Sequence, residues 1–76
     1  MDKFFVLSQD KKLVGLFDAI MQKGYEVYGY IGSEGFLLGK YTYQENIVDI
    51  IEQIYKHYNP ITPFKMPKQT EWYNVQ

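Results

Sequence analysis

Residues 4–17 read FFVLSQDKKLVGLF, two apolar runs separated by a short polar stretch. Apolar runs rich in Phe, Val and Leu on either side of a polar loop are typical of a β-hairpin, so we expect strands over residues 3–8 and 12–17. Asp10-Lys11 offers neither the Gly nor the Asn of a two-residue turn, which favours a longer loop built on a type I turn. Ser8 suits this loop because its short side chain can hydrogen-bond to nearby backbone groups.

Both faces of this hairpin are apolar. Alternate residues of a strand point to opposite faces, so Phe4 and Val6 oppose Phe5 and Leu7, while Leu13 and Phe17 oppose Val14 and Leu16. One helix can cover only one face of a sheet, so the other face needs a second cover. The covers open to this chain are curling into a small barrel, a folded-back C-terminal arm, the segment 18–23, or another subunit.

Three further elements follow the hairpin. The segment DAIMQKG, residues 18–24, predicts a short helix between an Asp18 N-cap and a Gly24 C-terminal cap, with a continued irregular strand as the alternative. The alternating stretch YEVYGYI, residues 25–31, predicts a strand. GSEG then turns the chain, and FLLGKY, residues 36–41, predicts the strand that pairs with it in a second hairpin.

A long helix is predicted next. Thr42-Tyr43-Gln44-Glu45 has the form of a capping box, which places the helix start at Thr42. Apolar residues at helical spacing form one stripe: Ile47, Ile50, Ile51, Ile54, Tyr55 and Tyr58. We expect the helix to end near Asn59-Pro60, because the residue before a proline avoids the α region. Two more prolines follow, so residues 61–76 are expected to form an extended arm.

Together these elements predict an α+β fold with one domain over residues 1–60 and an arm over residues 61–76. The expected order is β-β-(short α)-β-β-α. Two hairpins form a four-stranded antiparallel sheet, open or curled toward a small barrel, and the long helix packs on one face.

The composition limits the classes of function. The chain has 76 residues, one histidine, no cysteine and a formal net charge of −1. A domain this short buries only about 60% of the surface that its unfolded chain exposes, so its stability is limited. Without cysteine it has neither a disulfide nor an ordinary structural zinc site, and we expect no metal and no cofactor. We therefore expect stabilisation as a homo-oligomer, most simply a dimer. The balanced charge argues against nonspecific binding to nucleic acid or membranes.

The apolar runs also bear on location. The amino-terminal run is too short for a signal peptide, and no run approaches the ~20 residues that span a bilayer. We therefore expect a cytoplasmic location.

The residues capable of chemistry have simpler explanations. Ser8 and Lys11 could form a nucleophile and base, but a lysine in a polar loop stays solvated and charged. The glycines of GYIGSEGFLLG, residues 29–39, precede a strand instead of the helix N-terminus that a phosphate loop needs. His57 has no evident partner for proton transfer, and we expect it to be solvated at the helix end. We predict no catalytic residues.

Aromatic residues make up 18% of the chain, and most are tyrosines. Tyr28 and Tyr30 share one face of their strand, where tyrosine rings can pack against a protein or stack on single-stranded bases. Only Lys40 is nearby to supply the basic groove that nucleic acid needs, so protein contact is favoured. The candidate contact residues are Phe5, Leu7, Tyr28, Tyr30, Phe64, Met66 and Trp72.

Several of these motifs occur together in one known group. They are the SQDK turn at residues 8–11, Leu13-Val14, LGKY at residues 38–41, Thr42 with Glu45 before the aliphatic stripe, and Met66-Pro67. In this combination the chain resembles a group of short uncharacterised proteins of Firmicutes and their phages, although its helix carries Ile and Tyr where Ala, Val and Leu are common. The resemblance implies the fold described above and a bacterial or prophage context, and it implies no activity.

We therefore predict a noncatalytic protein-interaction module that self-associates and contacts an unidentified protein partner. The alternative is a single-stranded nucleic-acid-binding protein that uses the tyrosine-rich strand face.

Overall fold

A computed structural model describes residues 3–57 and 61–68. Its elements are β1 (Phe4–Leu7), β2 (Val14–Phe17), β3 (Ala19–Lys23), β4 (Glu26–Ile31), β5 (Glu34–Lys40), α1 (Gln44–Tyr55) and β6 (Phe64–Lys65). The α+β class is confirmed. The strands form two sheets of three strands, ordered β2-β1-β6 and β3-β4-β5, and not the predicted single four-stranded sheet. The two sheets do not close into a barrel.

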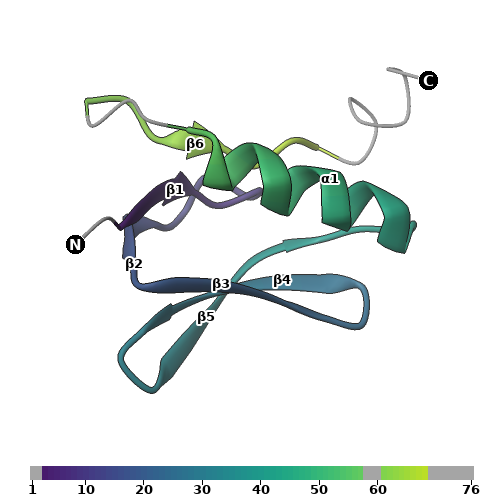
Figure 1. Ribbon diagram of the computed structural model, residues 1–76, viewed down its shortest axis with the longest axis horizontal. Helices are drawn as coiled ribbons and strands as arrows, with labels where there is room; N and C mark the ends of the chain where they lie inside the picture. Colours follow the sequence, from purple (N-terminus) through teal and green to yellow (C-terminus); the bar gives the residue numbers. More distant parts are fainter. Residues whose placement is uncertain (1–2, 58–60, 69–76) are drawn as a thin grey trace.

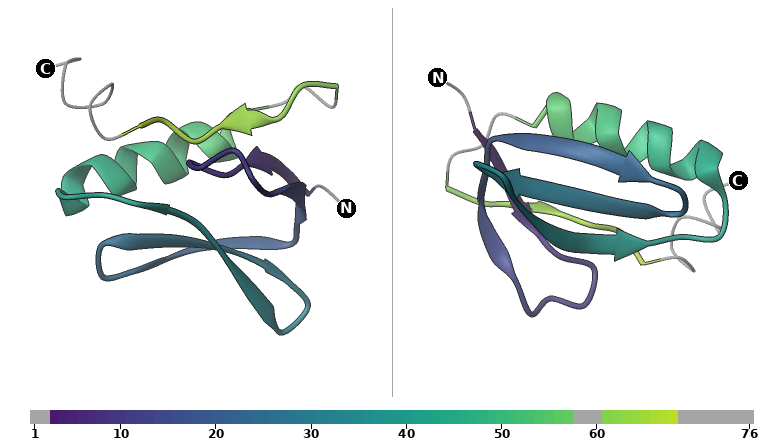
Figure 2. Two further views of the ribbon diagram at one scale, coloured as in Figure 1. Left: turned by 180° about the vertical axis from the view of Figure 1, so that it is seen from behind. Right: turned by 90° about the horizontal axis from the view of Figure 1, so that it is seen from below.

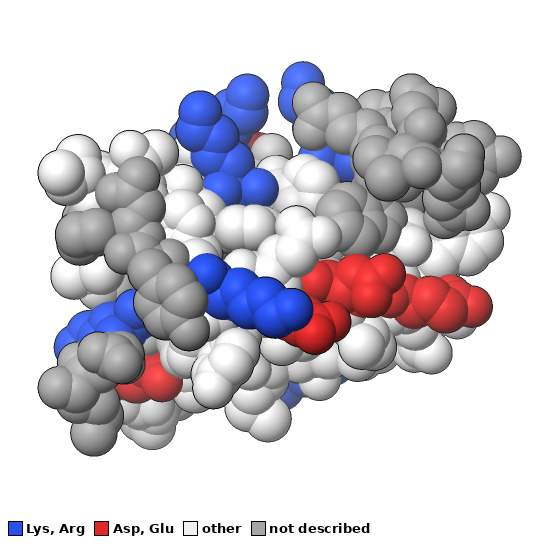
Figure 3. All heavy atoms as spheres, turned by 45° about the horizontal axis from the view of Figure 1, so that its top comes forward, with Lys and Arg blue, Asp and Glu red and all other residues white. Residues whose placement is uncertain are grey.

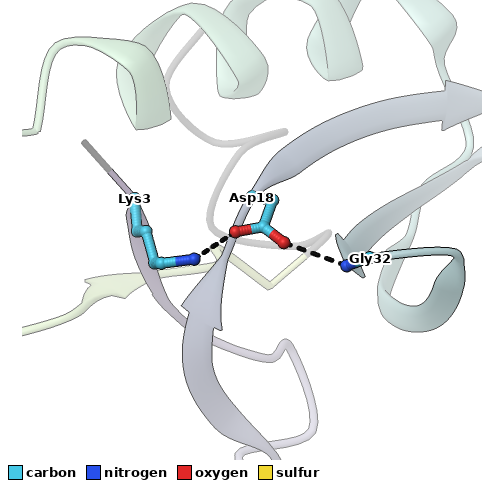
Figure 4. A network of polar contacts seen from close by, with 3 residues as sticks. All are labelled: Lys3, Asp18 and Gly32. Carbon is cyan, nitrogen blue, oxygen red and sulfur yellow. Dashed lines mark hydrogen bonds and ion pairs between the residues drawn. The ribbon is translucent and has the colours of Figure 1, made fainter. Parts of the chain in front are cut away.

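The sheets separate at Asp18, where the chain bends between β2 and β3. The predicted short helix over residues 18–23 is wrong, because residues 19–23 pair antiparallel with β4, from Ala19 opposite Tyr30 to Lys23 opposite Glu26. The Asp18 carboxylate acts across the bend instead of capping a helix: it binds the Lys3 ammonium and accepts a hydrogen bond from the Gly32 N–H at 2.9 Å (Figure 4). Tertiary strand pairing has overridden the local helix signals.

Two-residue turns join β3 to β4 and β4 to β5. Gly24 has φ +61° and Gly32 has φ +62°, and each is the first residue of its turn. A glycine with positive φ at that position is the signature of type II′ turns, which match the twist of the flanking strands. Gly24 is therefore a hairpin residue and not the helix cap that was predicted.

The helix α1 begins later and ends earlier than predicted. Its N-cap is Tyr43, one residue after the predicted start at Thr42, and the Tyr43 side chain makes no capping hydrogen bond. The Asn46 N–H instead donates to the Tyr43 carbonyl at 3.2 Å. The helix ends at Tyr55, and the predicted end at residues 59–60 lies outside the described residues. The predicted stripe is confirmed at Ile47, Ile50 and Ile54, which are buried, whereas Tyr55 is 67% exposed.

The chain after the helix returns to the first strand. β6 pairs in parallel with β1, Val6 opposite Phe64 and Leu7 opposite Lys65, and the Met66 N–H donates to the Leu7 carbonyl at 3.1 Å. Residues 61–68 are thus part of the fold and not a separate arm. The rest of the predicted arm, residues 69–76, lies outside the described residues.

The core lies between α1 and the inner faces of both sheets. In Figures 1 and 2, α1 and the β2-β1-β6 sheet lie on the same side of the β3-β4-β5 sheet, whose other side is covered by no described segment. The buried apolar side chains come from every layer: Val6, Phe17, Val27, Leu38, Tyr41, Ile47, Ile50, Ile54 and Met66. The helix therefore covers inner faces, β6 extends the first sheet at its edge, and no segment within residues 3–57 and 61–68 covers the outer faces.

Gln9 connects the two sheets at one edge. Its backbone N–H donates to the Leu38 carbonyl at 2.7 Å, and its side-chain oxygen accepts a hydrogen bond from the Lys40 N–H at 3.0 Å. Its side-chain NH₂ group donates to the Pro67 carbonyl at 3.3 Å. A single glutamine therefore satisfies backbone groups at the edge of β5 that a neighbouring strand would otherwise satisfy.

Candidate interaction surfaces

The outer face of the β3-β4-β5 sheet carries an exposed apolar row. Met21, Tyr28 and Leu37 lie opposite one another across the three strands, and Tyr30 lies in the next row between Ala19 and Gly35. Met21 is 48% and Leu37 is 47% exposed, while both tyrosines are half-buried. We call Met21, Tyr28, Tyr30 and Leu37 the tyrosine face.

The Tyr30 ring packs on the neighbouring strand at Gly35, and both tyrosine rings lie near Lys23. A Cβ atom at Gly35 would lie 2.9 Å from the Tyr30 ring, so the absence of a side chain there allows the ring to lie on the strand. The Lys23 Nζ atom lies 5.3 Å from the centre of the Tyr28 ring and 5.4 Å from that of Tyr30. A cation at this distance is attracted by the negative faces of the rings. The two rings are therefore held in place on an otherwise open surface.

Charged groups border the tyrosine face at one end, in a row formed by Lys23, Glu26 and Lys40. The Tyr28 hydroxyl donates to a Glu26 carboxylate oxygen at 3.0 Å, which raises the pKa of Tyr28. Contact with Tyr30 raises the pKa of Lys23, so this lysine stays charged at neutral pH. The row holds two lysines and one glutamate, so it would repel a copy of itself placed directly over it.

A second apolar face lies on the other sheet. Phe5 lies opposite Leu16, and Leu7 lies opposite Val14, on the side of β1 and β2 that points away from buried Val6. Val14 is 51% and Leu16 is 54% exposed. We call Phe5, Leu7, Val14 and Leu16 the β1–β2 outer face.

The predicted contact residues thus fall into three groups. Phe5 and Leu7 lie on one open face, and Tyr28 and Tyr30 lie on the other. Phe64 packs against the core, and Met66 is 4% exposed, so its assignment to the contact surface is corrected. Met66 is buried because Gly39 leaves room for it: a Cβ atom there would lie 3.2 Å from the Met66 Cε atom. Trp72 lies outside the described residues.

Sequence reasoning missed Met21, Leu37, Val14 and Leu16 as contact residues. The alternation of Val14 and Leu16 was visible in the sequence and indicated an apolar outer face. Met21 was hidden by the helix predicted for its segment. Leu37 was hidden by the irregular register opposite Val27 and Tyr28, which makes Leu38 an extra residue and reverses the expected alternation.

The loop between β1 and β2 is a closed set of hydrogen bonds. The buried Ser8 hydroxyl donates to the Asp10 carboxylate at 2.6 Å and accepts a hydrogen bond from the Leu13 N–H at 3.1 Å. The Lys12 N–H also donates to Asp10, and these bonds lower the pKa of that carboxyl. Ser8 is therefore occupied in shaping the turn, as predicted for this stretch, and it does not contact a lysine ammonium.

Two further polar residues pack in the structure. His57 is half-buried, its Nε2 atom lies 2.7 Å from the Thr62 carbonyl oxygen, and its ring meets Phe64 edge-on at 5.9 Å between centres. The expectation of a solvated histidine is therefore wrong, because the chain returns past the helix end. The Tyr41 hydroxyl donates to the Pro67 carbonyl at 2.7 Å, and burial raises the pKa of Tyr41.

An open groove of about 520 Å³ lies beside the start of α1. It is lined by Gln22, Tyr25, Thr42, Tyr43, Gln44, Glu45 and Val48. Its charged side chain is the Glu45 carboxylate, which opposes the binding of an anion there.

Comparisons with protein-family models, with curated proteins and with solved structures give no match for this chain. Within residues 3–57 and 61–68, no helix has the length and apolar character needed to cross a membrane.

Proposed function

We propose that this protein is a noncatalytic protein-interaction module that self-associates through the tyrosine face. The observation that carries the proposal is the row of Met21, Tyr28 and Leu37, open across a whole three-stranded sheet. Large apolar side chains left in water forgo about 1.5 to 3 kcal/mol each, and a domain of this size has little stability to spare. Aromatic residues and methionine are the types enriched at the centres of protein interfaces.

The geometry of the face favours a second copy of the chain as its occupant. A two-fold axis near Tyr28 would place the Lys23–Glu26–Lys40 end of one copy over the opposite end of its partner, beyond Ala19 and Gly35, so that the two charged ends stay apart. The apolar row would meet itself across the axis. We also propose a cytoplasmic location and the bacterial or prophage context that the SQDK, LGKY and T-x-x-E motifs suggest.

The experiment is sedimentation equilibrium of the full chain at micromolar and higher concentration. The natural sequence is expected to form dimers, and Met21→Lys is expected to shift the chain to monomer because it places a charge in the apolar row. Val48→Lys is the matched control, since Val48 is 58% exposed and lies on α1 away from the face. A monomer throughout the concentration range, or equal effects of the two variants, would contradict the proposal.

Single-stranded nucleic-acid binding is the second candidate. The position of Lys23 over both tyrosine rings favours it, because stacking platforms for bases combine aromatic rings with cations. Titration with a labelled oligothymidylate at low ionic strength tests it. Binding that weakens with salt and with Tyr28→Ala would support this function, and the absence of binding at low salt would end it.

A further inference from the structure

Lysines gather at one end of the β1–β2 outer face. Lys65 lies opposite Leu7 on the neighbouring strand and therefore points to the same side as Leu7. Lys11 and Lys12 lie in the loop that joins β1 to β2 at this end. All three are exposed, and the ion pairs among the described residues, Lys3 with Asp18 and Lys56 with Glu52, involve none of them.

Gln9 adds a fourth lysine to this end of the molecule. Its side chain accepts a hydrogen bond from the backbone of Lys40, which brings that strand end beside the loop. The acidic groups here are Glu26, which lies opposite Lys40, and Asp10, whose carboxylate is engaged by Ser8 and by the backbone of Lys12. At the other end of the face, Lys3 and Asp18 neutralise one another.

The charges are segregated over the molecule. Figure 3 shows several lysine side chains at the top of the view and a row of acidic side chains at the right, with further lysines beside that row and at the left. The exposed acidic residues of α1 are Glu45, Asp49 and Glu52. A net charge near zero therefore conceals a basic end and an acidic helix, which the spread of charges along the sequence did not indicate.

We propose that the β1–β2 outer face binds an acidic amphipathic helix of a partner protein. The apolar centre, Phe5, Leu7, Val14 and Leu16, would take the apolar stripe of such a helix, and Lys11, Lys12 and Lys65 would face its carboxylates. The chain already shows the same arrangement on its inside, where α1 lays Ile47, Ile50 and Ile54 on the sheets and keeps its acidic residues outward. An outer helix would complete a layered arrangement of helix, sheet and helix.

Three other molecules could occupy the β1–β2 outer face: a second copy of the chain, a nucleic acid and a lipid surface. A second copy docked face to face would bring lysines either against lysines or against the neutral Lys3–Asp18 pair, so charge would not favour its docking. Nucleic acid would meet mainly aliphatic side chains, which do not stack on bases as aromatic rings do. A lipid surface would need protruding apolar groups, and of the four apolar residues of this face only Val14 and Leu16 are more than half exposed, while Phe5 and Leu7 are half-buried.

The test measures fluorescence anisotropy of a labelled helical peptide of about 15 residues, with leucines on one face and glutamates on the other. Matched peptides carry glutamine or lysine in place of glutamate. We expect the acidic peptide to bind the full chain, the glutamine peptide to bind more weakly, the lysine peptide not to bind, and added salt to weaken binding.

Variants of the protein locate the site. Lys12→Gln combined with Lys65→Gln is expected to weaken binding about fivefold or more at low salt, and Lys56→Gln, at the residue after α1, is the control that should leave it unchanged. Leu16→Ser is expected to weaken binding about fivefold, with circular dichroism confirming that the variant is folded. Equal binding of acidic and glutamine peptides, or lysine variants that bind like the natural sequence, would overturn the proposal. So would lysine-dependent binding of an oligothymidylate, or of phosphatidylglycerol vesicles, in preference to the acidic peptide.

Discussion

Gly29→Ala should be the most damaging substitution of a single methyl group in the fold. Gly29 is buried on the inner side of β4, and a Cβ atom there would lie 2.7 Å from two carbons of the Phe17 ring and 2.9 Å from the Leu38 Cδ1 atom. Phe17 is 0% and Leu38 is 1% exposed, so both are enclosed by other core side chains. Neither can move aside without disturbing its own neighbours.

The magnitude follows from overpacking. Extra methyl groups in a packed core cost about 1 to 3 kcal/mol, and two enclosed neighbours place Gly29→Ala at about 3 kcal/mol. A glycine in a strand is otherwise about 0.5 to 1 kcal/mol worse than alanine, so the loss is steric and not conformational. In a domain of this size, about 3 kcal/mol lowers the Tm by roughly 12 to 24 °C.

The assay is thermal and urea denaturation followed by circular dichroism. Gly15→Ala is the matched control, because a Cβ atom at Gly15 would meet the Phe17 ring at 3.4 Å, an ordinary contact distance. That variant should stay within about 0.5 kcal/mol of the natural sequence. Phe17→Leu in the Gly29→Ala background should cost less than it does alone, since it removes the clashing ring carbons. A Gly29→Ala protein as stable as the Gly15→Ala control would refute the packing described for this side of β4.

Three further predictions concern the loop, the bend and the returning strand. Lys11 has φ +64°, a conformation that residues with side chains rarely adopt, so Lys11→Gly should raise the free energy of unfolding by about 0.5 to 1 kcal/mol. Lys12→Gly, at the next residue, should lower the free energy of unfolding. Urea denaturation of both variants measures these changes, and equal effects would contradict the turn geometry. The hydrogen bonds from Lys3 and the Gly32 N–H lower the pKa of Asp18 in the folded state. Their contribution to the stability of the fold is therefore complete above the pKa of Asp18 in the unfolded chain, and it is lost as the pH falls through the pKa of Asp18 in the folded state. The Tm of the natural sequence should therefore fall more than that of Asp18→Asn between about pH 5 and pH 2, and parallel curves would show that the bend is not held by this carboxylate. Met66→Ala should lower the free energy of unfolding by about 2 to 4 kcal/mol, because Met66 is buried in the core. Ile61→Ala, at a residue that is 86% exposed, should change it by no more than about 0.5 kcal/mol. A small loss for Met66→Ala would mean that the returning segment contributes little to the core.

The sequence predicted the parts of the fold that depend on local periodicity. The buried positions of Val6 and Phe17 follow from strand alternation, and the Ile47, Ile50 and Ile54 stripe follows from helical spacing. The bend at Asp18 could not be predicted in this way. Its segment carries helix formers between cap residues, and only the pairing with β4, a contact distant in the sequence, makes it a strand.

The candidate surfaces were predicted only where they depend on alternation along a single strand. Two apolar sheet faces were expected from residue alternation in the first hairpin, and both Phe5 and Tyr28 lie on open faces. Met66 was misplaced because its pocket is formed by Gly39 and Tyr41, which only the folded chain brings beside it. The lysines beside the β1–β2 outer face were missed because Lys65 comes beside Leu7 only through strand pairing, and the strand end at Lys40 comes beside the loop only through Gln9.

The methyl NMR signals of the methionines test self-association through the tyrosine face most directly. Met21 lies on that face, on the edge strand β3, and is 48% exposed, whereas Met66 lies in the core at 4% exposure and serves as an internal reference. As the protein concentration rises from about 10 μM to about 1 mM, the Met21 methyl signal should shift or broaden while the Met66 signal stays constant. A Met21 signal that stays constant over this range would contradict self-association through this face.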